Sequence, residues 1–352
     1  MKKIVYYIIF YLNWIFGLSL VLAYLGTIIS PEKIWWLAFF GLVYPWLLIA
    51  NLLFFLFWLF KLRKNLLISL IAILLGLSQM NNYLPVFNKD QKPEKGKDIQ
   101  YKELKILSYN VRAFNIYEWL NDPNTRKGIF NFVRSEHPDI ICMQEFYTSS
   151  SIQPERINRI FLETPYQHIS YSIKTGGSTG YGIATFSKYP IVNRGRIQFE
   201  NSANQTIFTD IDVNGEIIRV YNNHLQSVKL RANNYNFLDS MNLKNKDKQI
   251  RELQDLSVKL KTAFIKRAKQ ATIVSNHISK SPYPVIVCGD FNDTPISYTY
   301  SKMKKGLTDA FVEAGEGVGS TYLGRLSFRI DYIFYSEEFK AVDFEKVETR
   351  LS

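Results

Sequence analysis

Hydrophobic residues are distributed unevenly along the chain, and this pattern divides it into two parts. The first 88 positions are almost wholly apolar and aromatic, whereas the sequence from position 102 onward mixes short apolar runs with polar segments. Between them, residues 89–101 are charged and include a proline and a glycine, as expected of a solvated tether. We therefore predict a membrane anchor (1–88), a tether (89–101) and a soluble domain (102–352).

Three stretches of the anchor lack charged residues and are candidates for transmembrane helices, at about 4–30, 34–60 and 65–87. A helix needs about 20 apolar residues to cross the hydrocarbon core. The third stretch is the weakest because its densely apolar portion, Leu66–Leu77, is short. We expect two or three transmembrane helices. The first stretch is too long for a cleaved signal peptide, which favours an uncleaved anchor.

Positive charges in the short loops predict the orientation of these helices. They are Lys2 and Lys3 at the N-terminus, Lys33 in the first loop, and Lys61, Arg63 and Lys64 in the second. Because cytoplasmic loops collect positive charge, the N-terminus and the second loop should lie inside. With three spans the soluble domain then faces the extracytoplasmic side, and with two it faces the cytoplasm. The lipid bilayer is the partner that this part predicts, and no protein partner is predicted.

Apolar runs bounded by turn residues predict an α/β domain from position 102 onward. Strands are expected near 104–111, 139–145, 182–187, 207–213, 217–222, 284–289 and 330–335. The central runs lack polar alternation, which is typical of strands covered on both faces. Apolar residues at three- and four-residue spacing predict a core-packed helix over 246–279. Cys142 and Cys288 lie in apolar runs and are interpreted as buried core residues, with a single disulfide as the alternative.

Polar residues occur where several apolar strands end, although burying an unpaired carboxylate is costly. They are Asn110, Glu145, His224, Asp290, Asn292 and Asp331. Asp290 and Asn292 are two residues apart, so on an extended chain they would point to the same face. Glu145 offers only acceptor oxygens when ionised, which suits the hard cation Mg²⁺. Each residue also has a structural interpretation: Asn110 could cap a turn, and Asp331 could pair with Arg329.

The remaining histidines and the net charge are less informative. His137, His168 and His277 lie in contexts typical of helix ends and loops, where we expect surface positions. The formal net charge of +12 suits an anionic partner such as nucleic acid, a phosphorylated metabolite or a lipid surface, without choosing among them.

Taken in order, six segments resemble the endonuclease/exonuclease/phosphatase superfamily, which includes DNase I-like nucleases, inositol polyphosphate phosphatases and neutral sphingomyelinases. The segments are Ile106–Arg112, Pro138–Glu145, Gly182–Lys188, Asn222–Leu225, Gly289–Asp293 and Arg329–Phe334. The resemblance covers about residues 102–352 and implies a DNase I-like four-layer α/β/β/α sandwich. Apolar spans before such a domain look similar to bacterial members, which implies a multi-pass protein of a bacterial-type inner (plasma) membrane.

The resemblance also implies roles for the strand-end residues. Asn110 and Glu145 would hold Mg²⁺, with Mn²⁺ as the alternative. His224 would hydrogen-bond a phosphoryl oxygen, and Asp290 with Asn292 would orient or deprotonate the attacking water. Asp331 would complete the catalytic set. The implied function is hydrolysis of a phosphodiester or phosphomonoester in a nucleic acid, a phospholipid head group or a small molecule.

One departure from the family pattern affects this interpretation. Members of the family carry a Ser-Asp-His motif near the C-terminus, whose His pairs with the residue matched here by Asp331. The present sequence ends at Leu351-Ser352, where that Asp-His would follow. We expect a truncated fragment that is weakly active or inactive as written, and whose activity rises when the missing residues are restored.

Two other function classes stay open. One is a catalytically inactive, membrane-tethered binding module, which would lack the terminal Asp-His motif. The other is a transport or assembly element in which the apolar segment does the main work. Against the second, residues 4–30 and 34–60 contain none of the charged residues that usually mark ion or substrate paths.

Overall fold

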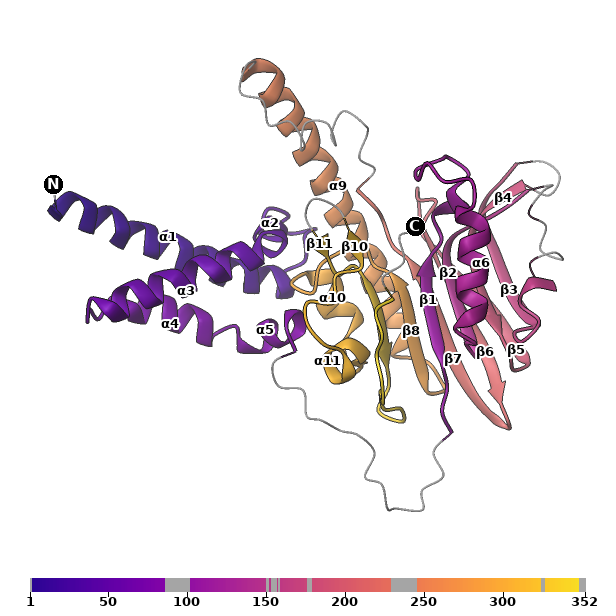
Figure 1. The fold of residues 1–352 in the computed structure, drawn as a ribbon. Coiled ribbons are helices and arrows are strands. Elements are labelled where there is room, and N and C mark those ends of the chain that lie inside the picture. Colours follow the sequence, from indigo (N-terminus) through magenta and orange to yellow (C-terminus); the bar gives the residue numbers. More distant parts are fainter. Residues whose placement is uncertain are drawn as a thin grey trace, which may run out of the picture.

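The computed structural model describes residues 2–85, 102–149, 152, 157, 159–175, 179–228, 246–323 and 327–347. The predicted tether (89–101) and residues 348–352 lie outside the described residues. A group of N-terminal helices extends from one side of a sheet-rich body (Figure 1).

The N-terminal helices form an antiparallel bundle. They are α1 (Lys2–Ile28), α2 (Leu37–Leu42), α3 (Tyr44–Phe60), α4 (Leu66–Leu74) and α5 (Leu77–Tyr83). Among the described residues, only α1 is by itself long and apolar enough to cross a membrane. Helix α3 is an apolar helix of 17 residues. Helices α4 and α5 pass the same test as a pair but are bent by 66° at their junction. The predicted second and third spans are thus each interrupted, after Leu42 and near Gly76.

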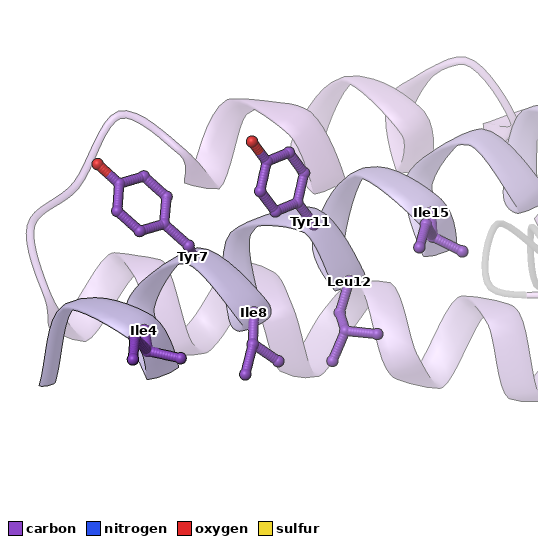
Figure 2. Close-up of a pocket in the computed structure, with 6 residues that line it drawn as sticks. All are labelled: Ile4, Tyr7, Ile8, Tyr11, Leu12 and Ile15. Atoms are coloured by element: carbon purple, nitrogen blue, oxygen red, sulfur yellow. The ribbon is translucent and has the colours of Figure 1, made fainter. Parts of the chain in front are cut away.

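The bundle buries a few polar side chains among apolar ones and has an apolar outer surface. Asn13, Asn51 and Ser69 are fully buried. The amide of Asn13 donates to the Asn65 carbonyl, and that of Asn51 donates to the Phe16 carbonyl, so these side chains join helices. Figure 2 shows an outer face of α1, where a shallow hollow is lined by Ile4, Tyr7, Ile8, Tyr11, Leu12 and Ile15. Apolar surface of this kind is suited to contact with lipid.

Two stacked sheets form the body of the soluble part. The four-stranded sheet has the order β1-β2-β4-β3 and the six-stranded sheet the order β5-β6-β7-β8-β12-β9. The strands of the first are β1 (Ile106–Asn110), β2 (Ile140–Thr148), β3 (Tyr166–Thr175) and β4 (Thr179–Ser187). Those of the second are β5 (Ile191–Gln198), β6 (Gln205–Val213), β7 (Glu216–His224), β8 (Val285–Asp290), β9 (Thr308–Asp309) and β12 (Asp331–Tyr335).

Every strand expected from the sequence is present, and within the two sheets β3, β5 and the short β9 are additional. A hairpin of β10 (Tyr322–Leu323) and β11 (Ser327–Phe328) stands beside the six-stranded sheet. The further helices are η1 (Arg112–Asn115), α6 (Thr125–Ser135), α9 (Lys246–Ile278), α10 (Tyr298–Met303) and α11 (Ala310–Ala314).

Successive side chains of the central strands point to opposite faces, and this alternation produces the four layers. In β2, Ile140 and Cys142 face the second sheet, whereas Ile141 and Met143 pack against α6. In β8, Ile286 and Cys288 face the first sheet, and Val287 packs against α9. The order is therefore α6, four-stranded sheet, six-stranded sheet, α9, which is the predicted α/β/β/α sandwich. Both cysteines are buried and free, as expected for core residues.

The helical bundle is docked on the soluble domain. Ile296 is buried in a cluster with bundle residues that include Leu20, Tyr44 and Leu48. A Cβ atom at Gly41 would lie 2.0 Å from the Ile296 carbonyl oxygen, so α2 lies very close to the loop that carries Ile296. Asn82 accepts a 2.7 Å hydrogen bond on its carbonyl from Arg329 and another on its side chain from Lys304.

Candidate active site

The strand-end residues converge because they continue the register that faces the space between the sheets. His224 pairs with Asp290 across the parallel strands β7 and β8, and Asp290 pairs with Asp331 across β8 and β12. Asn110 ends β1 in the other sheet. Each lies two residues or a multiple of two from a core residue that faces between the sheets. The same alternation that builds the core therefore delivers these side chains to one edge of the sandwich.

Glu145 reaches this edge through a break in the alternation. By strict alternation it would follow Ile141 and Met143 towards α6, away from the site. A β-bulge lies between Met143 and Phe146 in the pairing of β2 with β4, and Glu145 has a left-handed backbone with φ of 51°. Bulges re-aim side chains in this way, and a left-handed non-glycine residue costs about 1–3 kcal/mol. Phe146 then returns to the α6 side.

The amide of Asn110 joins the two sheets at the centre of the site. Its Nδ2 atom lies 3.2 Å from Glu145 Oε1 and 3.0 Å from Asp290 Oδ2. Its Oδ1 atom accepts a 3.0 Å hydrogen bond from the backbone N–H of Arg112. Asn110 is therefore a part of the polar cluster, and it also closes the turn after β1. The turn-capping alternative describes what Asn110 does here, and metal binding by this residue stays a prediction.

His224 faces the same cluster. Its Nε2 atom lies 3.8 Å from Glu145 Oε1, beyond hydrogen-bond reach. The side chain is buried, and within the described residues Nε2 has no hydrogen-bond partner. Because an unpaired buried polar atom is costly, this nitrogen is well placed to bind an additional group at the site.

Asn292 is held differently from the extended arrangement expected from the sequence. Strand β8 ends at Asp290, and Asn292 has a left-handed φ of 53°. Its backbone N–H donates to Asp290 Oδ1 at 2.8 Å, and its side-chain amide donates to the Leu225 carbonyl at 3.1 Å. The shared-face argument from spacing is therefore wrong here. Asn292 instead fixes the rotamer of Asp290 and the loop that follows His224.

Burial and neighbouring charges disfavour the ionised forms of Asp290 and Asp331. Burial raises the pKa of Asp290, and the charge of Glu145 raises it further, while His224 and the hydrogen bonds from Asn110 and Asn292 oppose the shift. Burial also raises the pKa of Asp331, followed by the charge of Asp290. The backbone N–H of Asp331 donates to the Thr321 hydroxyl. Arg329, considered as its partner, pairs with Asp309 at 2.8 Å instead.

Sequence reasoning did not find Tyr181 on β4. Burial and the neighbouring Glu145, with which its hydroxyl hydrogen-bonds, raise the pKa of this tyrosine. The exposed Tyr117 and the carboxylate of Asp290 also influence it, so both lie near the site. An isolated tyrosine between two glycines gives no signal that it will meet a glutamate, because only the pairing of β2 with β4 brings them together.

A buried amide network lies behind the site. Gln144 Nε2 donates to Asn222 Oδ1 at 2.8 Å, and Asn222 Nδ2 donates to the Ala184 carbonyl at 2.8 Å. Both side chains are fully buried between the sheets. These bonds fix the separation of β2, β4 and β7, and therefore the positions of Glu145 and His224.

One of the other histidines is buried and another is half-buried. His168 is buried on β3, with Nδ1 at 2.9 Å from the Thr209 hydroxyl, and burial together with Arg194 lowers its pKa to about 4. His277, near the end of α9, bonds the Tyr221 hydroxyl at 2.8 Å and stays partly exposed. The expectation of a surface position was wrong for His168, because a strand that the sequence did not reveal carries it. His137 is exposed as expected.

The donor atoms of the cluster suit a hard divalent cation. The carboxylates of Glu145 and Asp290 flank the Asn110 amide, and Asp331 pairs with Asp290 across the strands, so acidic oxygens gather at a position where a cation would neutralise their charge. Within the described residues, no group of three or more His, Cys, Asp or Glu side chains has a geometry that could hold a metal ion. Mg²⁺ is usually bound through one or two carboxylates and several waters, so the residues fit this ion better than a metal that requires a full protein cage.

Comparison with known families agrees with this geometry. The model of the Endonuclease/Exonuclease/phosphatase family matches residues 107–352, which is more than half of the chain. The chain belongs to this family. A second model, for a domain of unknown function (DUF8431), matches residues 4–83 of the bundle. A comparison with curated protein sequences finds no significant match.

Three solved structures show some similarity to this chain. An endonuclease/exonuclease/phosphatase protein from Bacteroides vulgatus has a TM-score of 0.47 at 17% identity, covering 67% of this chain and 88% of its own. One from Leptotrichia buccalis has a TM-score of 0.45 at 21% identity, covering 68% and 89%. Humanized TDP2 of D. rerio has a TM-score of 0.46 at 15% identity, covering 68% and 86%. The family match over residues 107–352, together with the two stacked sheets, confirms the predicted fold class, and the family supports phosphoester chemistry in general.

Proposed function

We propose that this protein is a membrane-anchored, Mg²⁺-dependent phosphoesterase of the endonuclease/exonuclease/phosphatase family. The observation that supports this most is the meeting of Asn110, Glu145 and Asp290 within hydrogen-bond distance, beside His224. These residues are separated by up to 180 positions in the sequence. Four strands and a bulge are needed to assemble them, which favours a catalytic purpose over turn capping.

Glu145 and Asn110 are the proposed ligands of Mg²⁺, with Mn²⁺ as a substitute. Asn110 would ligate through Oδ1, which requires its amide to rotate away from the Arg112 N–H. The bound ion would neutralise charge that develops on the phosphoryl group. Because Asn110 Nδ2 now spans two carboxylates, the same rotation would release Asp290 for its own task.

Asp290 is the proposed general base for the attacking water. Its raised pKa brings it nearer to the range in which a carboxylate accepts a proton efficiently. The Asn292 N–H holds Oδ1, so Oδ2 is the atom that would receive the proton. His224 would donate from Nε2 to a phosphoryl oxygen, and Asp331 would tune the charge on Asp290 across the β8–β12 pair.

The substrate class is a phosphoester in a nucleic acid, a phospholipid head group or a small molecule. A panel of supercoiled DNA, single-stranded RNA, phosphatidylcholine and sphingomyelin vesicles and inositol phosphates would identify it. Specificity in such folds lies in loops rather than in the sheets. The aromatic loop after β1, with the exposed Tyr117 and Trp119, is one that such substrates would meet.

Helix α1 is the proposed uncleaved anchor, in a bacterial-type inner membrane, with α3 and the bent α4–α5 pair as further membrane-inserted elements. The outward apolar surface and the inward asparagines of the bundle support this arrangement. Lys2, Lys3 and the basic loop 61–64 favour a cytoplasmic N-terminus. If the α4–α5 pair crosses, the active site faces outward.

The decisive test is hydrolysis of bis(p-nitrophenyl) phosphate, in detergent or nanodiscs, by the chain extended with the C-terminal Asp-His that the family resemblance implies. We expect turnover that needs Mg²⁺ and disappears in Asp290→Ala, while Glu216→Ala, an exposed acid at the other end of β7, keeps it. Binding of Mn²⁺, followed by its electron spin resonance signal, should weaken in Glu145→Gln. Hydrolysis that survives both EDTA and Asp290→Ala would refute the mechanism. Metal binding without turnover on any substrate would instead favour a binding module.

A further inference from the structure

Helix α9 is much longer than the sheet that it covers. Its C-terminal half, from Ala263 to Ile278, buries Phe264, Ala268, Ala271 and Val274. Its N-terminal half, which begins at Lys246, rises beyond the sheets past the end of the helical bundle where α2 lies (Figure 1), and its residues from Gln249 to Thr262 are largely exposed. A core-packing role therefore accounts for only half of this helix.

One stripe of α9 already contacts the anchor. The Phe264 ring meets the Phe39 ring edge-on at 5.4 Å. One turn earlier, Lys261 Nζ lies 4.9 Å over the Trp35 ring. Trp35 and Phe39 belong to the segment between α1 and α3, where the bundle meets the soluble domain. Indole rings of this kind favour the boundary between lipid and water.

The same stripe continues along the exposed half as apolar surface. Counting back from Phe264 and Lys261, helical spacing places Leu253 and Ile250 on the same side of α9. Their side chains are 51% and 53% exposed. Asp255 and Lys259, which pair with each other at 2.6 Å, lie on the opposite side. An apolar stripe opposite a charged face is the pattern of a helix that lies in a membrane interface.

We propose that the N-terminal half of α9 rests on the bilayer surface, with Ile250 and Leu253 inserted at the level of Trp35. This inference rests on the proposed anchoring of the bundle. The bilayer is the occupant because the stripe is continuous with the anchor contact and ends beside interfacial tryptophans. Basic residues on α9, including Arg251 and Lys261, would be attracted to anionic head groups.

Site-directed spin labelling of the whole chain in nanodiscs tests this proposal. Cys142 and Cys288 are buried, so a single introduced cysteine can be labelled selectively. Leu253→Cys carries the label on the stripe, and Asp255→Cys is the matched control on the other side of the same turn. The discs contain phosphatidylcholine with phosphatidylglycerol and one protein each. Collision with oxygen reports lipid, and collision with a water-soluble nickel chelate reports water.

We expect the oxygen-to-nickel ratio at position 253 to exceed that at 255 several-fold. Equal exposure of both labels to the nickel chelate would overturn the proposal while leaving the anchor intact. A label at 253 shielded from both reagents would also overturn it, since another part of the protein, or a second copy, would then cover the stripe. A chain that does not enter nanodiscs at all would refute the anchor itself and this contact with it.

Discussion

Asp290 and Asp331 lie directly opposite each other in the antiparallel pair of β8 and β12. Opposed residues in such a pair have Cα atoms about 4.5–5.5 Å apart, and like charges there are destabilising. Burial raises the pKa of both carboxyl groups, the charge of Asp290 raises that of Asp331 further, and the charge of Glu145 contributes to both. The site therefore holds negative charge that the fold alone does not neutralise.

A first prediction concerns the pH dependence of stability. A carboxyl group whose folded-state pKa is raised stabilises the fold below its unfolded pKa, near 4, and this contribution is lost as pH rises through the folded value. In EDTA, the free energy of unfolding should thus fall between pH 5 and pH 8. Mg²⁺ should raise the melting temperature more at pH 8 than at pH 5. A Mg²⁺ effect that is equal at both pH values would contradict the charge argument.

A second prediction separates stability from activity at this pair. Asp290→Asn removes one of the opposed charges but keeps an oxygen that can accept the Asn292 N–H. In EDTA at pH 8 the variant should be more stable by about 1 kcal/mol, measured by urea unfolding. Its hydrolytic rate should fall by roughly 100-fold or more, because the general base is lost. A variant that is less stable at pH 8 would show that the pair is not repulsive.

A third prediction concerns Gly289, the residue before Asp290. It has φ of 133°, and a Cβ atom there would lie 2.1 Å from the Asn223 carbonyl oxygen. Gly289→Ala should cost about 3 kcal/mol or more, since backbone strain and overpacking add. Gly215→Ala is the matched control, with φ of 96° and open space around the Cβ position, and should cost only about 1 kcal/mol. Similar losses in both variants would show that the contact with Asn223 does not matter.

A fourth prediction concerns Tyr181. Tyr181→Phe removes the hydroxyl that hydrogen-bonds Glu145 and should weaken Mn²⁺ binding roughly 10-fold, as other losses of support behind metal ligands do. Tyr171→Phe removes a hydroxyl that bonds Thr148 on the same sheet and should leave binding unchanged. If both substitutions have the same effect, Tyr181 contributes only to the packing of the sheet.

A fifth prediction concerns the junction of anchor and domain. Gly41→Ala would drive a methyl group against the Ile296 carbonyl oxygen, a backbone atom held in place by the bundle. Protease cleavage of the folded chain should therefore accelerate near residues 290–300. Gly17→Ala, whose Cβ would meet only the Cγ2 methyl of Ile68 at 3.2 Å, within the bundle and away from the junction, is the control and should cleave at the original rate. Unchanged cleavage in Gly41→Ala would mean that the two parts are loosely joined.

Much of the fold and of the candidate site followed from simple periodicity. Asn110, His224, Asp290 and Asp331 lie in the register of neighbouring core residues, so alternation explains which face of its own strand each one occupies, whereas the meeting of these strands was implied by the family resemblance. Glu145 is the exception, since its bulge and left-handed backbone depend on the pairing of β2 with β4, which a single sequence does not reveal. The prediction that Asn292 shares a face with Asp290 was wrong for the same reason, because contacts with β7 and β12 determine where β8 ends.

The surroundings of residues that belong to no motif could not be predicted from the sequence. Tyr181 and His168 acquire their surroundings from strands far away in the chain, and the tie between Asn82 and Arg329 spans 247 positions. The hydrophobic pattern predicts an anchor followed by a tether. Nothing in that pattern indicates that the loops of the bundle pack against the loop after Asp290.

That packing connects the helical bundle mechanically to the loop that follows Asp290. Ile296 is enclosed by the bundle only six positions after Asp290, so the chain that carries Asn292 is held at both ends, by a sheet on one side and by the helices on the other. A tilt of those helices in a thinner or thicker bilayer would pull on this short span. Bilayer thickness would then act on turnover as an allosteric effector does, with no ligand bound.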